Sequence, residues 1–496
     1  MVRRLGRRQF LSLAAAPIAA RASGAQRTRP SIVFILMDDM AQRALSCYGN
    51  PHVPTPNLDR LARDGMKFTD AYVTPQCTPT RATLLTGQYT ARNKMWHVIP
   101  GYGYPWARVT EPRFRVNFPR EAYTLAKGLQ SAGYATACIG KWHLTANEDG
   151  NYTSLRPEAS RYYGFDATLT PSRIPNELGI GGDKAVNRIT DEAIQFIEAN
   201  RDRPFFCYIP HHSIHGVVAA PPDLIRKYRE KGSPESGLQN ATYLAAIEHM
   251  DTAIGRLLKR IDDLGLAGNT LVWFLTDNGG VVEKWIPETQ PGGSVRLRHE
   301  AGEFENPPLR AGKGSSYEGG IRVPMIVRWP GVARPGSVCQ TPVHGVDLLP
   351  TLLEIAGAKP PAGYPVDGVS ILPLFKGGKI AARPLYWYMP FYDIRWAHTP
   401  SAVVREGDYK LIEYFGDFIE TERGGEYVTG RRVELYNLRS DIGERKNLAE
   451  ADPRRTRRMT EKLHAWIRSC GEEIPQLNPD FDAARALAER RGAPAP

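Results

Sequence analysis

Several features that would assign this chain to other classes of protein are missing from its sequence. No apolar run approaches the roughly 20 residues needed to cross a bilayer, so we expect no stable membrane insertion. No two of the 6 cysteines stand in a CxxC spacing, and their scatter along 496 residues argues against a disulfide scaffold. No basic patch is interleaved with aromatic residues, which argues against nucleic-acid binding. With 42% hydrophobic and 24% charged residues, the composition is that of a soluble globular protein.

The N-terminus has the pattern of an export signal. Residues 1–25 combine a basic start, a short apolar segment and small residues that suit a signal peptidase. The pair Arg7-Arg8 in "RRQFL" resembles a twin-arginine signal, so we expect the twin-arginine export machinery as a partner and a periplasmic or secreted location. The alternative is an ordinary secretory signal or a basic anchor helix. Removal of this segment lowers the formal charge from +11 to +6, a modest excess that helps to attract anionic substrates.

Strands and helices alternate along most of the chain, which predicts an α/β fold with helices on both faces of a sheet. The run "SIVFILM" (31–37) is continuous, apolar and β-branched, as a buried strand requires. Helix and strand then follow one another as "EAYTLAKGLQSAGY" and "ATACIG", "DEAIQFIEAN" and "PFFCYIP", and "TYLAAIEHMDTAIGRLLKRIDDLG" and "TLVWFLT". The strand "VPMIVRWP" and the helix "GVDLLPTLLEIAG" complete the predicted set.

The character of the sequence changes after about Leu374. The segments "LYWYM", "SAVVREGDYKLIEYF" and "RRVELYNL" are short, aromatic-rich and separated by Gly and Asp turns, which predicts a small antiparallel sheet. A helix around Arg454–Ile467 closes this sheet. We therefore expect a main domain at 26–375, an α+β subdomain at 376–470 and a tail at 471–496.

Two pairs of oxygen-bearing side chains directly follow predicted strands. Asp38 and Asp39 come after "SIVFILM", and Asp277 and Asn278 come after "TLVWFLT". Ligands of open α/β sheets bind beyond the carboxyl ends of the strands, and adjacent carboxylates suit a hard divalent cation such as calcium. The alternatives are an acidic turn in water for the first pair and an Asp-Asn-Gly turn for the second.

Basic side chains occupy two other places of interest. Lys141 and His143 in "GKWHL" are two residues apart, so on an extended segment they point to the same side, as anion binding with proton transfer would need. Lys313 lies in the glycine-rich loop "LRAGKGSSYEGGIRVP", which lacks the spacing of a phosphate-binding P-loop. The alternative for this lysine is an ordinary surface charge.

Three histidines follow the predicted strand "FFCYI". A lone histidine is usually structural, whereas His211, His212 and His215 at one strand end favour a functional site. A zinc site is the weaker alternative for them.

The stretch "PQCTPTRATLLTG" (75–87) holds Cys77, Pro79 and Arg81 in a C-x-P-x-R spacing. With the other motifs in the same order, this signature resembles the type I sulfatases, the formylglycine-dependent enzymes of the alkaline phosphatase-like superfamily. The resemblance extends from about Arg29 to Ala449. It implies a mixed sheet sandwiched by helices with a smaller C-terminal antiparallel sheet, and it makes 26–375 the catalytic domain.

The resemblance implies that Cys77 is converted to Cα-formylglycine. A maturation enzyme that recognises the neighbouring proline and arginine would be a partner of the chain. One calcium ion per chain, with magnesium as the alternative, would be held by Asp38, Asp39, Asp277, Asn278 and the modified Cys77. The ion would hold a sulfate oxygen and act as a Lewis acid.

The resemblance also implies roles for the basic residues. Arg81 would neutralise the metal-bound nucleophile and fix the helix that carries it. Lys141 and Lys313 would bind the sulfate. His143 would take the proton that allows sulfate to leave, and His215 would act as general acid on the leaving group.

One motif departs from the family pattern. The family usually reads H-x-P-H, whereas this chain has His212-Ser-Ile-His215, with Ile214 in the place of the proline. Whether His212 or His215 faces the sulfur therefore stays open.

The substrate class is the least determined expectation. Segments 91–116 and 281–307 are long, mixed loops rich in Trp, Tyr, Arg and His, which suits either a carbohydrate subsite or a simple cover over the sheet. Sulfated glycans and small aryl sulfates both fit. The alternatives to a sulfatase are a phosphonate monoester or phosphodiester hydrolase with the same site, and an inert polysaccharide-binding protein with an unmodified Cys77.

Overall fold

The fold is described from a computed structural model. It covers the following residues: 29–145, 153–170, 176–179, 181–289, 295–302, 306–421, 424–487 and 491–492. The predicted export signal at 1–25 lies outside the described residues. Within those ranges, none of the helices combines the length and apolarity needed to cross a membrane.

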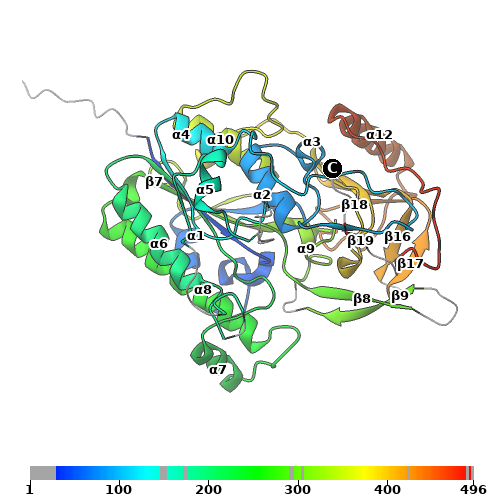
Figure 1. Ribbon diagram of the computed structural model, residues 1–496, viewed down its shortest axis with the longest axis horizontal. Coiled ribbons are helices and arrows are strands. Elements are labelled where there is room, and N and C mark those ends of the chain that lie inside the picture. The colour runs from blue at the N-terminus through cyan, green and yellow to red at the C-terminus, as the bar shows by residue number, and fades with distance from the viewer. Residues whose placement is uncertain are drawn as a thin grey trace, which may run out of the picture.

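A mixed sheet of nine strands, counted over the described residues, forms the centre of the molecule (Figure 1). Its strands are β1 (Ser31–Met37), β2 (Met66–Tyr72), β4 (Ala135–Cys138), β5 (Ala167–Thr168), β6 (Phe205–Pro210), β7 (Thr270–Thr276), β10 (Arg322–Arg328), β11 (Ser337–Cys339) and β12 (Val343–His344). Their order is β11-β2-β10-β7-β1-β6-β4-β5, and β12 pairs with β2. Strand β1 pairs in parallel with β6 and β7, while β10 runs antiparallel to β2 and β7.

Helices cover both faces of this sheet. The helices of the described residues, of which α12 packs on the C-terminal sheet instead, are α1 (Pro56–Arg63), α2 (Cys77–Thr86), α3 (Thr90–Asn93), α4 (Leu125–Ser131), α5 (Pro157–Ser160), α6 (Val186–Ala199), α7 (Pro222–Glu230), α8 (Ala241–Asp263), α9 (Glu318–Ile321), α10 (Leu348–Ala356), α11 (Leu372–Phe375) and α12 (Pro453–Ser469). Successive side chains of a strand point to opposite faces, so Phe34 packs with α2, α4 and α10, while Ile35 packs with α1, α6 and α8. The α/β sandwich expected from the sequence is confirmed.

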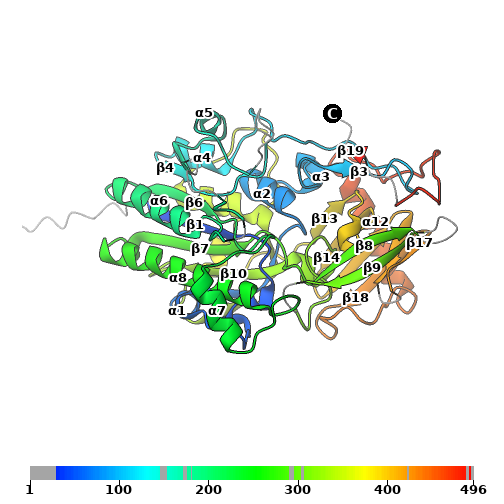
Figure 2. The same ribbon diagram turned by 60° about the horizontal axis from the view of Figure 1, so that its bottom comes forward.

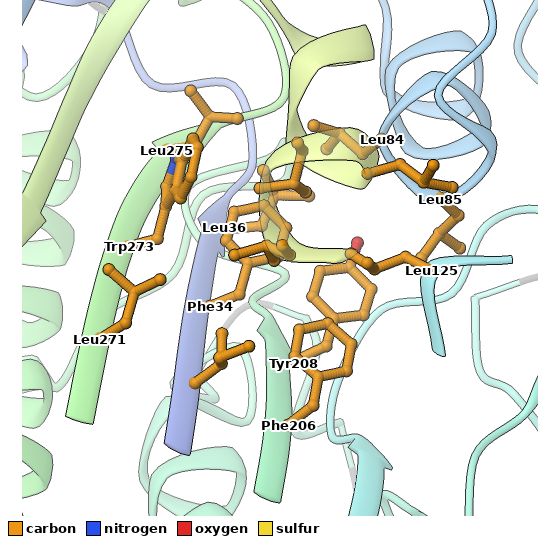
Figure 3. Packing of buried hydrophobic residues seen from close by; sticks show 14 of the residues in the cluster. Phe34, Leu36, Leu84, Leu85, Leu125, Phe206, Tyr208, Leu271, Trp273 and Leu275 are labelled. Atoms are coloured by element: carbon orange, nitrogen blue, oxygen red, sulfur yellow. The ribbon is translucent and has the colours of Figure 1, made fainter. Parts of the chain in front are cut away.

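The first of these two cores holds the helix that begins at Cys77. Figure 3 shows Phe34 of β1, Tyr208 of β6 and Trp273 of β7 on one face of the sheet, with Leu84 and Leu85 of α2 above them. Each such side chain, fully buried, contributes about 1.5–3 kcal/mol to folding. Helix α2 is therefore held firmly above the ends of the central strands.

The C-terminal part forms the predicted antiparallel sheet. Its four strands, in the order β13-β14-β15-β18, are β13 (Leu385–Met389), β14 (Ser401–Glu406), β15 (Tyr409–Tyr414) and β18 (Arg432–Asn437). Helix α12 packs on β14 and β15 and buries Met459, Leu463 and Ile467. This confirms the closing helix expected around Arg454–Ile467.

Segment 281–307, interpreted above as a loop, instead contains a β-hairpin. Strands β8 (Glu283–Thr289) and β9 (Val295–Ala301) pair along their length and join β17 (Glu426–Thr429) and β16 (Asp417–Glu420), as Figure 2 shows beside the C-terminal sheet. Charged residues interrupt the apolar ones in both strands, so no continuous apolar run marks them in the sequence. A two-stranded ribbon of β3 (Tyr102–Gly103) and β19 (Arg491–Gly492) joins segment 91–116 to the C-terminus.

Candidate active site

The site lies where the carboxyl ends of the central strands meet. Strand β1 ends at Met37 and leads into Asp38 and Asp39, and the neighbouring β7 ends at Thr276 and leads into Asp277. Because these strands are parallel neighbours, Asp38-Asp39 and Asp277-Asn278 reach the same edge of the sheet.

Helix α2 brings Cys77 to the same edge. Cys77 is its first residue, and Pro79 is tolerated in the first turn because amides there have no partner within the helix. The helix ends at Gly87, whose φ of 66° suits glycine. All of its residues are buried, so packing on every side fixes the direction in which Cys77 points.

Arg81 lies one helical turn after Cys77, on the same face of α2. Its guanidinium is fully buried and donates to Asp277 Oδ2 from Nη2 at 2.7 Å and from Nε at 3.1 Å. Nη2 lies 3.4 Å from Asp38 Oδ2, and Nη1 donates to the Lys141 carbonyl oxygen at 2.8 Å. Arg81 thus links α2 to the residues that follow β1, β4 and β7.

Carboxylates crowd around the Cys77 thiol. Ligand atoms of Asp38, Asp39, Cys77 and Asp277 lie within 4.8 Å of one another, and Cys77 Sγ is 3.4 Å from Asp38 Oδ1. Asn278 donates from Nδ2 to Asp39 Oδ1 at 2.7 Å, whereas its buried Oδ1 has no hydrogen-bond partner among the described residues. An orphaned amide oxygen beside three carboxylates is a donor set that fits a hard divalent cation.

Two lysines neutralise part of this negative charge. Lys141 Nζ donates to Asp38 Oδ2, and Lys313 Nζ donates to Asp39 Oδ2 at 2.7 Å. Both side chains are nearly buried, with 4% and 7% of their surface exposed, respectively. Lys141 and Lys313 lie far apart in the sequence, after β4 and before α9 respectively. The fold brings both ammonium groups to the same carboxylate cluster.

Burial and charge shift the acidic pKa values in opposite directions. Burial alone would raise the pKa of Asp38, but Lys141 and the other nearby cations hold it well below its usual range. Burial and the charge of Asp38 raise the pKa of Asp277 to about 7. Burial also raises the pKa of the Cys77 thiol, so the unmodified thiol is a poor nucleophile at neutral pH.

Three histidines surround the cluster. His143 Nε2 lies 3.1 Å from the Ile99 carbonyl oxygen, and His212 is 6% exposed. His215 is more open, with 38% of its side chain exposed, and its Nε2 lies 3.9 Å from Asp39 Oδ2. The charge of Lys313 and then burial lower the pKa of His215 to about 4, and burial lowers the pKa of His143 well below its usual range.

A cavity of about 680 Å³ opens onto this cluster. Cys77, Lys141, His143, His215 and Lys313 line its floor and wall. His211 is buried and does not line the cavity. Burial and the neighbouring His249 lower its pKa to about 3. Of the three histidines that follow β6, His212 and His215 therefore line the cavity and His211 does not.

Comparison with known families decides what kind of site this is. The family model "Sulfatase" matches residues 30–358, and "N-sulphoglucosamine sulphohydrolase, C-terminal" matches residues 312–472. The chain belongs to the sulfatase family.

Relatives of this sulfatase cover most of its length. Arylsulfatase A of Bos taurus is 33% identical, over 94% of this chain and 91% of its own. N-acetylgalactosamine-6-sulfatase of Rattus norvegicus is 30% identical, over 84% and 80%. A solved structure from work on glycosaminoglycan metabolism by Bacteroides thetaiotaomicron is 25% identical with a TM-score of 0.68, covering 89% of this chain and 100% of that one. As a sulfatase, the protein hydrolyses sulfate esters. This favours sulfate over the phosphonate alternative and catalysis over an inert binding protein.

The sulfatase cavity also contains side chains from outside the strand ends. Trp285 reaches it from the β8–β9 hairpin, within segment 281–307 that the sequence offered as a possible carbohydrate subsite. Trp396 reaches it from the C-terminal part and Lys184 from the segment before α6, and the sequence singled out neither. None of these residues follows a strand of the central sheet, so the rule that located the other site residues does not apply to them. In the sequence, Lys184 in "GGDKAV" has no feature that separates it from a surface lysine.

Proposed function

We propose that Cys77, converted to Cα-formylglycine by a maturation enzyme, is the nucleophile of this sulfatase. The observation that carries the proposal is the convergence of Cys77 with three carboxylates within 4.8 Å, at the floor of a cavity lined by Lys141 and Lys313. Hydrated formylglycine supplies one hydroxyl group for attack on sulfur and a second for expulsion of the sulfate.

We propose that the cations orient the substrate and the nucleophile. Lys141 and Lys313 line the cavity and bind the oxygens of the scissile sulfate, where their charge stabilises the developing negative charge. Arg81 is fixed by Asp277 and holds the first turn of α2, so that residue 77 keeps its direction. Its charge also favours the deprotonated form of a hydroxyl at that position.

Two histidines are proposed to move protons. A proton on His143 Nε2 is held by the Ile99 carbonyl 3.1 Å away, which makes Nδ1 the acceptor for the proton of the second hydroxyl at residue 77. His215 Nδ1 similarly contacts the Gly216 carbonyl oxygen at 2.7 Å, so Nε2 faces the substrate. To act as a general acid, His215 must carry a second proton on Nε2, and the negative charge of the bound sulfate ester favours this protonated form. Because His215 is the more exposed of the candidates, we assign it rather than His212 to the leaving group.

We propose that Asp38, Asp39, Asp277 and Asn278, with residue 77, hold one calcium ion, or magnesium in its place. The oxygen-only donor set and the orphaned Oδ1 of Asn278 support a hard cation. When bound, such an ion polarises a sulfate oxygen and lowers the pKa of the nucleophile.

The substrate is proposed to be a sulfated carbohydrate, with aryl sulfates as simpler substrates. The 30% identity to a protein named N-acetylgalactosamine-6-sulfatase supports a sugar sulfate, as do the tryptophans that line the cavity. The twin-arginine pattern at Arg7-Arg8 supports export to the periplasm or beyond through that machinery.

Sulfate release and metal dependence test the proposal together. The enzyme, made with a formylglycine-generating enzyme, should release sulfate from 4-nitrophenyl sulfate, and Cys77→Ala should abolish release. Chelation should stop turnover and lower the melting temperature, and calcium should restore both. Full activity of Cys77→Ala, or activity and melting temperature that chelators leave unchanged, would reject the nucleophile or the metal site respectively.

A further inference from the structure

Lys184 is a nearly buried lysine in the wall of the active-site cavity. Only 6% of its surface is exposed, and it lines the same 680 Å³ cavity as Cys77, Lys141 and His212. Ala185 separates it from the start of α6, and both Lys184 and Ala185 have left-handed backbone, with φ of 59° and 60°. The backbone amide of Lys184 donates to the Glu177 carbonyl oxygen at 3.0 Å, which anchors the segment.

The other buried cations of the site each have a carboxylate partner. Arg81 is paired with Asp277, Lys141 with Asp38 and Lys313 with Asp39. These pairs match each of the three clustered carboxylates with one cation.

Lys184 has no such partner. Throughout the described ranges, its ammonium group makes no hydrogen bond or ion pair. The acids close to it in sequence are engaged elsewhere, because Glu177 pairs with Arg188 at 2.8 Å and Asp183 lies 3.3 Å from His249 Nε2. Among the described residues, Lys184 is therefore a buried lysine of the cavity wall that no carboxylate pairs with, unlike Lys141 and Lys313.

A buried ammonium without a counter-charge is unfavourable. Burial lowers the pKa of Lys184 to about 8, and attraction to Asp38 and Asp39 offsets this only in part because Lys141 repels it. Lys184 lines the same cavity as His212, and its charge contributes to the lowered pKa of that histidine. An anion bound beside Lys184 in the cavity would supply the missing counter-charge.

We propose that Lys184 binds a second anionic group of the substrate, a carboxylate or a second sulfate, on the molecule that carries the scissile sulfate. This rests on the proposed function, in which Lys141 and Lys313 bind the scissile sulfate and leave Lys184 for another group. The enzyme is therefore selective for sulfate esters with a second negative charge close to the ester. Leu178 also lines the cavity and offers an apolar contact to the sugar or aryl ring.

Matched aryl sulfates test this selectivity. The kcat/KM of the mature enzyme is measured for 4-nitrophenyl sulfates with a carboxylate ortho or meta to the ester, and for the methyl esters of the same compounds. A nitrocatechol disulfate, in which the second negative charge is a sulfate, tests whether a sulfate serves in place of the carboxylate. The wild type should prefer the charged compounds, and Lys184→Met should reduce the preference about 10- to 100-fold, as loss of a charge-assisted hydrogen bond predicts.

Variants and outcomes separate this proposal from the proposed function. Lys184→Arg should keep most of the preference. Lys259→Met should keep all of it, because Lys259 lies on α8 with 71% of its side chain exposed and does not line the cavity. If Lys184→Met does not fold, Lys184→Gln serves the same comparison. No preference in the wild type, or an equal loss for charged and ester compounds in Lys184→Met, overturns the role of Lys184. Failure of the wild type to hydrolyse any of these sulfates would instead reject the proposed function.

Discussion

The ammonium group of Lys313 lies 5.6 Å from the centroid of the Trp396 ring. Trp396 ends a 3₁₀ turn at Ile394–Trp396, between β13 and β14 of the C-terminal sheet. Gly314 permits this approach, because its φ is 80° and an added Cβ would lie 2.3 Å from Trp396 Cγ. The C-terminal part of the chain therefore supplies a wall of the active site and positions a proposed sulfate-binding lysine.

Removal of the indole should weaken the action of Lys313. We expect Trp396→Leu to lower kcat/KM about 2- to 30-fold, since a cation–π contact contributes about 0.5–2 kcal/mol. A positioning role predicts that a Trp396→Phe variant recovers part of the loss. Trp466→Leu is the matched control, because Trp466 stacks on Tyr386 at 4.4 Å and does not line the cavity. Equal losses in the two leucine variants would show a general effect on folding instead.

The general-acid role of His215 predicts a dependence on the leaving group. A sugar alcohol needs a proton to leave, whereas 4-nitrophenol does not, so His215→Asn should reduce kcat for a sugar sulfate about 10²- to 10⁴-fold and for 4-nitrophenyl sulfate much less. His212→Asn should affect both substrates alike. If His212→Asn shows the selective loss and His215→Asn does not, the two assignments must be exchanged.

The sequence predicted the centre of the site better than its walls. Asp38, Asp277 and Cys77 follow strands or begin a helix at the strand ends, where local pattern and fold geometry agree. Lys184 and Trp396 reach the cavity from segments whose position depends on how separate parts of the chain pack, which no local pattern encodes. The β8–β9 hairpin was missed for a different reason, since charged residues interrupt the apolar ones in both of its strands. The domain boundaries near 375 and 470 stay predictions.

A buried ion cluster joins the main sheet to the C-terminal sheet. Lys410 is fully buried and contacts Glu318 Oε1 at 3.0 Å and Glu444 Oε1 at 2.8 Å. Lys410→Met removes the cation that pairs with buried Glu444, while Glu318 keeps Arg322 at 3.2 Å, and it should lower the free energy of unfolding by about 3–5 kcal/mol. Urea unfolding measures this, with the exposed Lys446→Met as control. A change below about 1 kcal/mol would mean that Glu444 takes up a proton at little cost.

Buried neutral histidines predict a loss of stability in acid. Burial lowers the pKa of His97 and of His398 from 6.5 to about 4 in the folded protein. Between these values the unfolded chain binds protons that the folded chain does not, so stability is full above about pH 6.5 and falls as the pH approaches about 4. Each histidine should account for about 3 kcal/mol of this loss.

Urea unfolding between pH 7 and pH 4.5 measures that slope. His398→Gln should make it shallower, because one group that titrates on unfolding has been removed. An unchanged slope in this variant would contradict the assignment of the acid sensitivity to the buried histidines.

The state of Cys77 in the active enzyme tests the account most directly. Peptide mass spectrometry across residues 75–87, on protein made with and without a formylglycine-generating enzyme, is read beside the rate of sulfate release from the same samples. The account predicts an aldehyde mass at Cys77 and a rate proportional to the aldehyde fraction. A fully active sample in which Cys77 remains a thiol would contradict it.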